Sequence, residues 1–174
     1  MNGVIRRTAT LVLLTLVAST VAFSQRNPRA TSKLDVAGKF VMIEYGRPSM
    51  KGRDLLALTE PGKVWRMGAD KSTTFTSDAR TSFGKVTVPE GSYSLWLKKV
   101  GDRSFDLIFN KQTGQWGTQY GSIDDVASIP VTLSESGEAV EIFTLSLARG
   151  AKANAGELTL HWGKAVLKTS FTAK

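Results

Sequence analysis

The chain has 174 residues, with 23 Lys and Arg against 15 Asp and Glu, a single His and no Cys. The absence of Cys excludes disulfide bonds, a thiol nucleophile and cysteine-ligated zinc or iron–sulfur sites. One imidazole is too few for the His ligands of a catalytic zinc. A hydrophobic fraction of 41% with 22% charged residues is typical of a globular domain and not of a disordered chain. We therefore predict no metal site and no cofactor.

The first 24 residues have the pattern of a secretory signal peptide. Two Arg residues precede an apolar stretch that ends at Phe23, and Ala22 and Ser24 are small residues where a signal peptidase reads them. The alternative is an uncleaved anchor, but Thr and Ser interrupt the stretch, which is shorter than the roughly 20 apolar residues of a spanning helix. We expect an exported protein, periplasmic or extracellular, with no membrane span after cleavage and no nucleic acid partner.

Residues 25–32 are polar, contain one Pro and are predicted to form a flexible lead-in. Residues 33–174 are long enough for one domain with its own core. The mature chain stays basic, which suits either an acidic partner or simple solubility. We favour solubility, because the basic residues are spread along the chain without a long run.

Beyond the lead-in, apolar and polar residues alternate with a period of two, as in half-buried strands. The segment 40–45 is the exception, since its composition predicts burial on both faces. Short helical turns are expected at 53–59 and 122–125, and a two-residue turn with Gly163 first predicts a hairpin. About nine to eleven short strands separated by turn signals predict an all-β fold, an antiparallel β-sandwich of jelly-roll kind. The predicted strands are 40–45, 85–88, 93–98, 105–110, 129–133, 140–147, 157–162 and the stretch after Gly163.

Several motifs together resemble one bacterial family. They are YGRPSMKGR at 45–53, GKVWRMGAD at 62–70, PEGSYSL at 89–95, IFNK at 108–111, QWG at 115–117 and LTLHWG at 158–163. This combination is similar to the exported family called domain of unknown function 2911, from about Asp35 to Phe171. Asp70 stands where that family usually has Asn, and the stretch from Leu55 to Pro61 lacks the family's Gly-rich, aromatic linker. The resemblance implies an exported β-domain and no established reaction.

The first two motifs also concentrate positive charge. Six cations lie between Arg47 and Lys71, and three acidic residues oppose them. Arginine presents a planar fork of donors that suits carboxylate or phosphate, and lysine adds a point charge. With two flat aromatic residues beside them, these loops predict a site for a small anionic or carbohydrate ligand. The candidate ligand-binding residues are Tyr45, Arg47, Lys51, Arg53, Trp65, Arg66 and Asp70.

Two alternatives stay open for the same residues. In the first, the Arg side chains clamp the Pro- and Gly-containing loops by donating to backbone carbonyls, as in a structural or protein-interaction domain. In the second, the protein is a hydrolase or isomerase acting on an envelope or extracellular carbohydrate, with Asp70 or His161 as acid or base. We expect a non-catalytic domain and predict no catalytic residue.

The alternation of side chains along a strand also predicts the direction of two further residues. His161 should point away from the core, because its neighbours Leu160 and Trp162 point into it. Trp96 should be exposed on the outer face of its strand unless a loop or a second sheet covers it. The oligomeric state is not predicted.

Overall fold

The computed structural model describes residues 27–174, and the predicted signal peptide lies outside this part. Ten antiparallel strands dominate the described residues, so the predicted all-β class is confirmed. The elements in chain order are β1 (Arg29–Val36), β2 (Lys39–Gly46), α1 (Leu55–Leu58), β3 (Val64–Arg66), β4 (Thr73–Ser77), β5 (Thr81–Phe83), β6 (Val86–Val88), β7 (Gly91–Lys99), β8 (Ser104–Asn110), the 3-10 turn η1 (Ser122–Asp124), β9 (Asp125–Arg149) and β10 (Ala155–Ala173). Within residues 27–174, no helix has the length and apolar character needed to cross a membrane.

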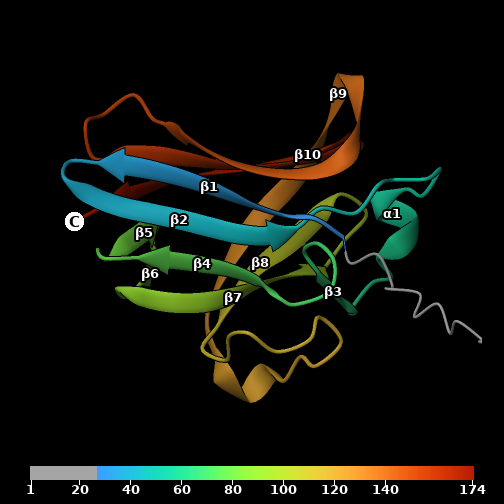
Figure 1. Ribbon diagram of the computed structural model, residues 1–174, viewed down its shortest axis with the longest axis horizontal. Coiled ribbons are helices and arrows are strands. Elements are labelled where there is room, and N and C mark those ends of the chain that lie inside the picture. Colours follow the sequence, from blue (N-terminus) through green and yellow to red (C-terminus); the bar gives the residue numbers. More distant parts are fainter. Residues whose placement is uncertain (1–26) are drawn as a thin grey trace, which may run out of the picture.

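Hydrogen bonds join the strands into one sheet in the order β1-β2-β4-β7-β8-β9-β10-β5-β6, with β3 also paired to β7. Most neighbours follow one another in the chain, and neither the sandwich nor the jelly-roll detail of the prediction is confirmed. The long strand β9 lets the sheet fold over itself (Figure 1). Its residues 125–132 pair with β8, whereas residues 133–135, 140 and 144–149 pair with β10.

The β1-β2 end of the sheet is hydrogen-bonded to the second half of β9. The Phe143 N–H donates to the Pro48 carbonyl at 2.9 Å, and the Met50 N–H donates to the Glu141 carbonyl at 2.7 Å. Further along β9, the Leu147 N–H donates to the Ser32 hydroxyl of β1 at 2.9 Å. These bonds hold the loop after β2, which carries several predicted site residues, against the second half of β9.

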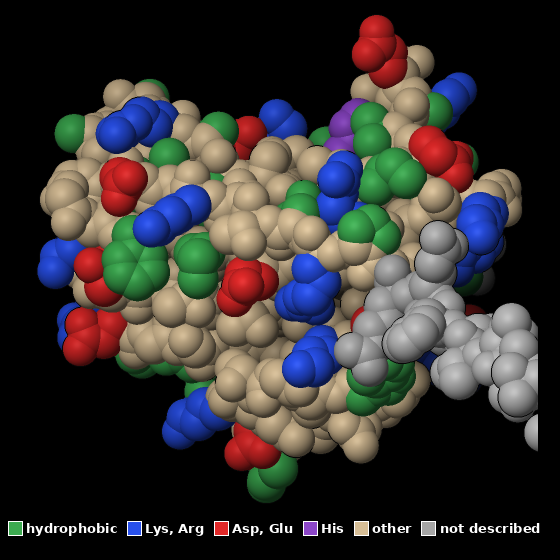
Figure 2. All heavy atoms as spheres, in the orientation of Figure 1, with side chains coloured by type: hydrophobic (Ala, Val, Ile, Leu, Met, Phe, Trp, Pro, Cys, Tyr) green, Lys and Arg blue, Asp and Glu red, His purple; other side chains and the backbone are tan. Residues whose placement is uncertain are grey.

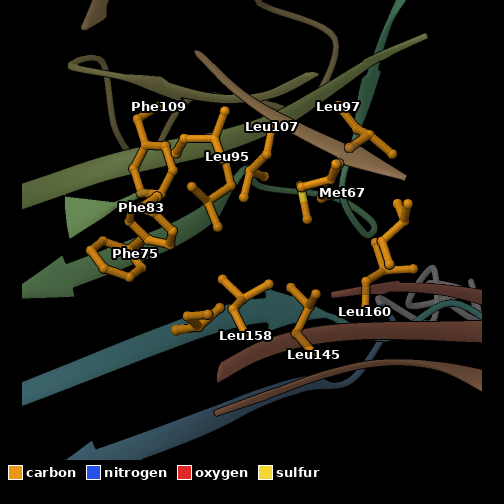
Figure 3. Packing of buried hydrophobic residues seen from close by; sticks show 14 of the residues in the cluster. Met67, Phe75, Phe83, Leu95, Leu97, Leu107, Phe109, Leu145, Leu158 and Leu160 are labelled. Carbon is orange, nitrogen blue, oxygen red and sulfur yellow. The ribbon is translucent and has the colours of Figure 1, made fainter. Parts of the chain in front are cut away.

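The core fills the space between the facing parts of the sheet. In Figure 3, Phe75, Phe83 and Leu107 point toward Leu145 and Leu158 from β9 and β10. All of these side chains are buried. Alternation predicts this arrangement correctly in β7 and β8, because their inward residues line the core.

Three local expectations are wrong. Residues 29–32 belong to β1, because their backbone pairs with residues 43–46 of β2, and they are not a flexible lead-in. The segment 40–45 is buried on one face only, since Glu44 on its other face is exposed. No hairpin forms at Gly163.

A bulge replaces that hairpin. Strand β10 continues through Gly163, whose φ is +57°, and its residues on both sides of this glycine pair with β9. Gly163 pairs with Val140 and Ala165 with Glu135, so residues 136–139 of β9 bulge outward. The left-handed glycine that sequence rules assign to a turn here permits a bend within a strand pair.

Both helical turns lie in the predicted segments. In α1 the carboxylate of Asp54 caps the first turn by accepting from the Leu56 N–H at 3.0 Å. The N-cap of η1 is Gly121, which makes no side-chain hydrogen bond.

Candidate functional site

Close contacts between glycines bring the two Arg-containing loops together. A Cβ on Gly46, at the end of β2, would overlap the carbonyl oxygen of Ala69. A Cβ on Gly68 would lie 2.8 Å from the Gly46 carbonyl oxygen, and its φ of +126° also favours glycine. A third segment joins at Gly117, whose N–H donates to the Asp70 carbonyl at 2.8 Å. The loops after β2, β3 and β8 therefore meet at one place.

A cavity of about 550 Å³ lies where these loops meet, and we call it cavity 1. It has the size of a small-molecule site. The two charged side chains in its lining are both cations, Arg53 and Arg66. The lining residues are Asn27, Pro48, Arg53, Leu58, Val64, Trp65, Arg66, Gly68, Ala69, Trp96, Gly117, Thr118, Tyr120 and Trp162.

Aromatic rings form much of the wall of cavity 1. Trp65 of β3 stacks on Trp162 of β10, with ring centroids 5.9 Å apart and planes 12° from parallel. Phe143 packs edge-on against both, at 5.8 and 5.9 Å. Trp96 and Tyr120 add a second pair at 5.0 Å. Such rigid flat surfaces suit the faces of a sugar ring or a planar ligand.

The two cations of cavity 1 have different surroundings. Arg53 donates from Nε to the Met50 carbonyl at 3.0 Å and from Nη2 to the Ser49 carbonyl at 2.6 Å. Its guanidinium lies 5.4 Å from the Trp162 ring, in a cation–π contact. Arg66 is half-buried, and among residues 27–174 no group accepts a hydrogen bond or ion pair from its guanidinium. Arg53 thus has the contacts of a loop clamp, whereas Arg66 has donors to offer a ligand.

The other predicted residues do not line cavity 1. Tyr45 is buried and packs edge-on against Phe143 at 5.8 Å. The Lys51 side chain is exposed, and its backbone N–H donates to Glu141 Oε1 at 3.0 Å. The Arg47 N–H donates to the Pro28 carbonyl, and its buried Nε has no acceptor among the described residues. The structure therefore gathers Arg53, Trp65 and Arg66 from the predicted set.

Asp70 supports the wall of the cavity from behind. Its carboxylate accepts from the backbone N–H of Asn27 at 3.0 Å and from the Asn27 side chain at 3.5 Å. Asp70 itself has a φ of +63°, a conformation that Asn and Asp adopt more readily than most residues. Asn would suit this backbone as well as Asp does.

Sequence reasoning did not assign the loop between β8 and β9 to the site, although the QWG motif lies in this loop. Its Tyr120 and Gly117 line cavity 1, and its Gln115 enters a buried polar cluster beneath. This loop covers Trp96, which is only 1% exposed. The sequence predicts that Trp96 is exposed unless a loop or a second sheet covers it, and the loop does so. The position of Trp96 on the outer face of its strand indicates that some segment covers it. Nothing in the sequence identifies Tyr120 as part of that segment.

Tyr120 is fixed to the start of β9 by a short hydrogen bond, and this bond predicts a pH effect. Its hydroxyl donates to Asp125 Oδ2 at 2.5 Å. Burial, this bond and the charge of Asp125 all raise the pKa of the Tyr120 hydroxyl far above its ordinary value. Stabilisation from this group is therefore fully present below the ordinary tyrosine pKa of about 10 and is lost as pH rises toward the folded value. Urea unfolding from pH 8 to 11 should show a shallower decline for Tyr120→Phe than for the wild type. Equal slopes would contradict this.

The remaining candidates lie elsewhere. His161 is half-buried on the outward face of β10 between the buried Leu160 and Trp162, as alternation predicts, and does not line cavity 1. Its Nε2 is buried and has no hydrogen-bond partner among the described residues. Within residues 27–174, no three carboxylate or imidazole side chains gather as a metal site would require.

Fold and site together define an all-β domain with a cavity built from Trp and Arg side chains. The family model described as "Protein of unknown function (DUF2911)" matches residues 27–171, and the chain belongs to this family. Comparison with curated proteins and with solved structures gave no match.

Proposed function

We propose that this protein is an exported, non-catalytic domain that binds a small anionic ligand, an acidic sugar in particular, in cavity 1. The observation that carries the proposal is the guanidinium of Arg66, which lines the cavity and has no acceptor among residues 27–174. No Arg66 nitrogen is among the buried side-chain atoms that lack a partner, so these donors stay accessible from the cavity. A ligand carboxylate or phosphate would supply acceptors for them in a two-pronged geometry.

Charge and shape support the same ligand class. The charged groups of the cavity lining are cations, so a carboxylate there meets no opposing acid among the described lining residues. The half-buried Trp65 lines the cavity with the buried Trp162 stacked against it, so Trp65 is the ring that a sugar can contact. Over the face drawn in Figure 2, Lys and Arg side chains are scattered among Asp and Glu, which favours a localised site over a general polyanion-binding surface.

Arg53 supports the structural alternative in part. Its bonds to the Ser49 and Met50 carbonyls hold the loop after β2, as a clamp would. The enzyme alternative needs Asp70 or His161 inside the cavity, and neither belongs to its lining. Clamping by Arg53 and binding through Arg66 are compatible, because the two residues occupy different parts of the same wall.

A single substitution tests the proposal. Gln keeps the Cβ, Cγ and Cδ atoms of Arg66, and these pack closely enough on Gly117 that a Cβ there would meet Arg66 Cδ at 2.5 Å. Arg66→Gln should therefore shift the melting temperature by less than about 2 °C. It should weaken glucuronate binding at least tenfold by calorimetry, because a charge-assisted pair is lost.

Arg149→Gln is the matched control, because Arg149 is exposed at the end of β9 and lines no part of cavity 1. This variant should bind glucuronate like the wild type. Equal affinity of the wild type for glucose and glucuronate would contradict recognition of an acid. A fall of several degrees in the Arg66→Gln melting temperature with unchanged binding would favour the clamp.

A further inference from the structure

A second cavity of about 420 Å³, which we call cavity 2, adjoins cavity 1. Arg53 and Trp162 belong to the linings of both cavities, so the guanidinium stacked on the indole is their common boundary. The loop after β2, the beginning of α1 and the bulge in β9 and β10 form the rest of cavity 2. The mispredicted hairpin at Gly163 thus lies at this second cavity.

Cavity 2 has a different chemical character from cavity 1. Its wall is largely apolar, with Met50, Leu55, Leu56, Leu133, Ala139 and Ala165. Its acidic groups are already engaged. Glu135 forms an ion pair with Arg103 at 2.8 Å, which lowers the pKa of Glu135, and the Asp54 carboxylate caps α1.

We propose that the two cavities are subsites for one amphiphilic ligand, whose acidic head occupies cavity 1 and whose apolar substituent occupies cavity 2. This inference rests on the proposed function, because cavity 1 supplies the site for the head. Cavity 1 has Arg66 and no acid among the described residues of its lining, whereas in cavity 2 the cation Lys164 is accompanied by Asp54 and Glu135 and most other side chains are apolar. This difference matches a molecule with an acidic end and an apolar end. Arg53 keeps Nη1 without an acceptor among the described residues, so it can contact the ligand where head and substituent join.

Three related probes separate the two subsites. Glucuronate carries the head alone, octyl glucoside the tail without the acid, and octyl glucuronide both. Calorimetric titration below the micelle concentration should show octyl glucuronide binding at least tenfold tighter than glucuronate. A tenfold gain corresponds to about 1.4 kcal/mol, which burial of about two methylene groups supplies. Octyl glucoside should bind more weakly than octyl glucuronide by at least tenfold.

Ala139→Phe tests the location of the tail. Ala139 is exposed on the bulge and lines cavity 2, so the larger ring fills the cavity from outside without disturbing the core. This variant should lose the tenfold gain and keep the affinity for glucuronate. The matched control is Ala148→Phe, an exposed alanine of the same strand that lines neither cavity, and it should keep the gain.

The outcomes distinguish the two proposals. If glucuronate binds but the octyl chain adds nothing, or if Ala139→Phe keeps the gain, the second subsite is refuted and the proposed function stands. If octyl glucoside binds as tightly as octyl glucuronide, the head assignment is refuted. If neither glucuronate nor octyl glucuronide binds, the proposed function fails, and the inference fails with it.

Discussion

Gly46→Ala is expected to lower the free energy of unfolding by about 3 kcal/mol, the upper part of the usual range for overpacking. The added Cβ would overlap the carbonyl oxygen of Ala69 and lie 2.9 Å from its carbonyl carbon and 3.0 Å from its nitrogen. These are backbone atoms, so no side-chain rotation relieves the clash. For a chain of this length, the melting temperature should fall by about 6 °C or more.

Gly137→Ala is the matched control for this prediction. Gly137 also lies in a strand, its φ is not positive, and a Cβ there meets nothing within 4 Å. Its alanine variant should stay within about 0.5 kcal/mol of the wild type in urea unfolding. Equal stability of the Gly46→Ala and Gly137→Ala variants would show that the loop after β3 moves away from β2 at little cost.

The contact of Gly46 with Ala69 also has a consequence for cavity 1. Gly68 and Ala69 line that cavity, and their position depends on the close approach of β2. We therefore expect the folded fraction of Gly46→Ala to bind glucuronate more weakly than the wild type. The glycine of the first motif acts on the site through the backbone, with no side chain of its own.

The sequence predicts those parts of the fold in which apolar and polar residues alternate regularly along a strand. In β7 and β8 the period of two identifies both the strands and their inward faces, because each strand has one face on the core. β1 is missed because its polar residues and adjacent Pro resemble a lead-in, and its backbone pairing with β2 has no sequence signal. The Gly163 bulge is missed for a related reason. A left-handed glycine fits a turn and a bulge equally well, and tertiary packing decides between them.

The candidate site is predicted in part, and the division has a physical cause. Charge and motif spacing identify Arg53, Trp65 and Arg66, because these loops are dense in cations. The same spacing cannot distinguish Tyr45 from the residues that line the cavity. Tyr45 lies on the inward face of β2 and is buried in the core against Phe143. Trp162 comes from a strand almost a hundred residues beyond Trp65, and only the fold brings the two rings together.

A buried polar cluster holds the loop between β8 and β9 over Trp96. Ser94 of β7 is fully buried, and its hydroxyl oxygen accepts from Trp96 Nε1 at 2.8 Å and from Gln115 Nε2 at 3.1 Å. Gln115 Oε1 in turn accepts from the Ser72 hydroxyl at 3.1 Å. One hydroxyl oxygen therefore satisfies two buried donors from different segments.

Ser94→Ala should lower the free energy of unfolding by about 3 kcal/mol, because the indole and amide N–H groups both lose their acceptor, at about 1–3 kcal/mol each. Ser92→Ala is the matched control in the same strand. Its hydroxyl is exposed and lies 3.0 Å from the Thr76 hydroxyl, so its loss should cost less than about 0.5 kcal/mol. Urea unfolding followed by tryptophan fluorescence compares the two variants. Because Gly117 and Tyr120 belong to the same loop, Ser94→Ala should also weaken glucuronate binding. Equal stability of both serine variants would show that the loop stays in place without this cluster, and that the aromatic contact of Trp96 with Tyr120 is what holds it.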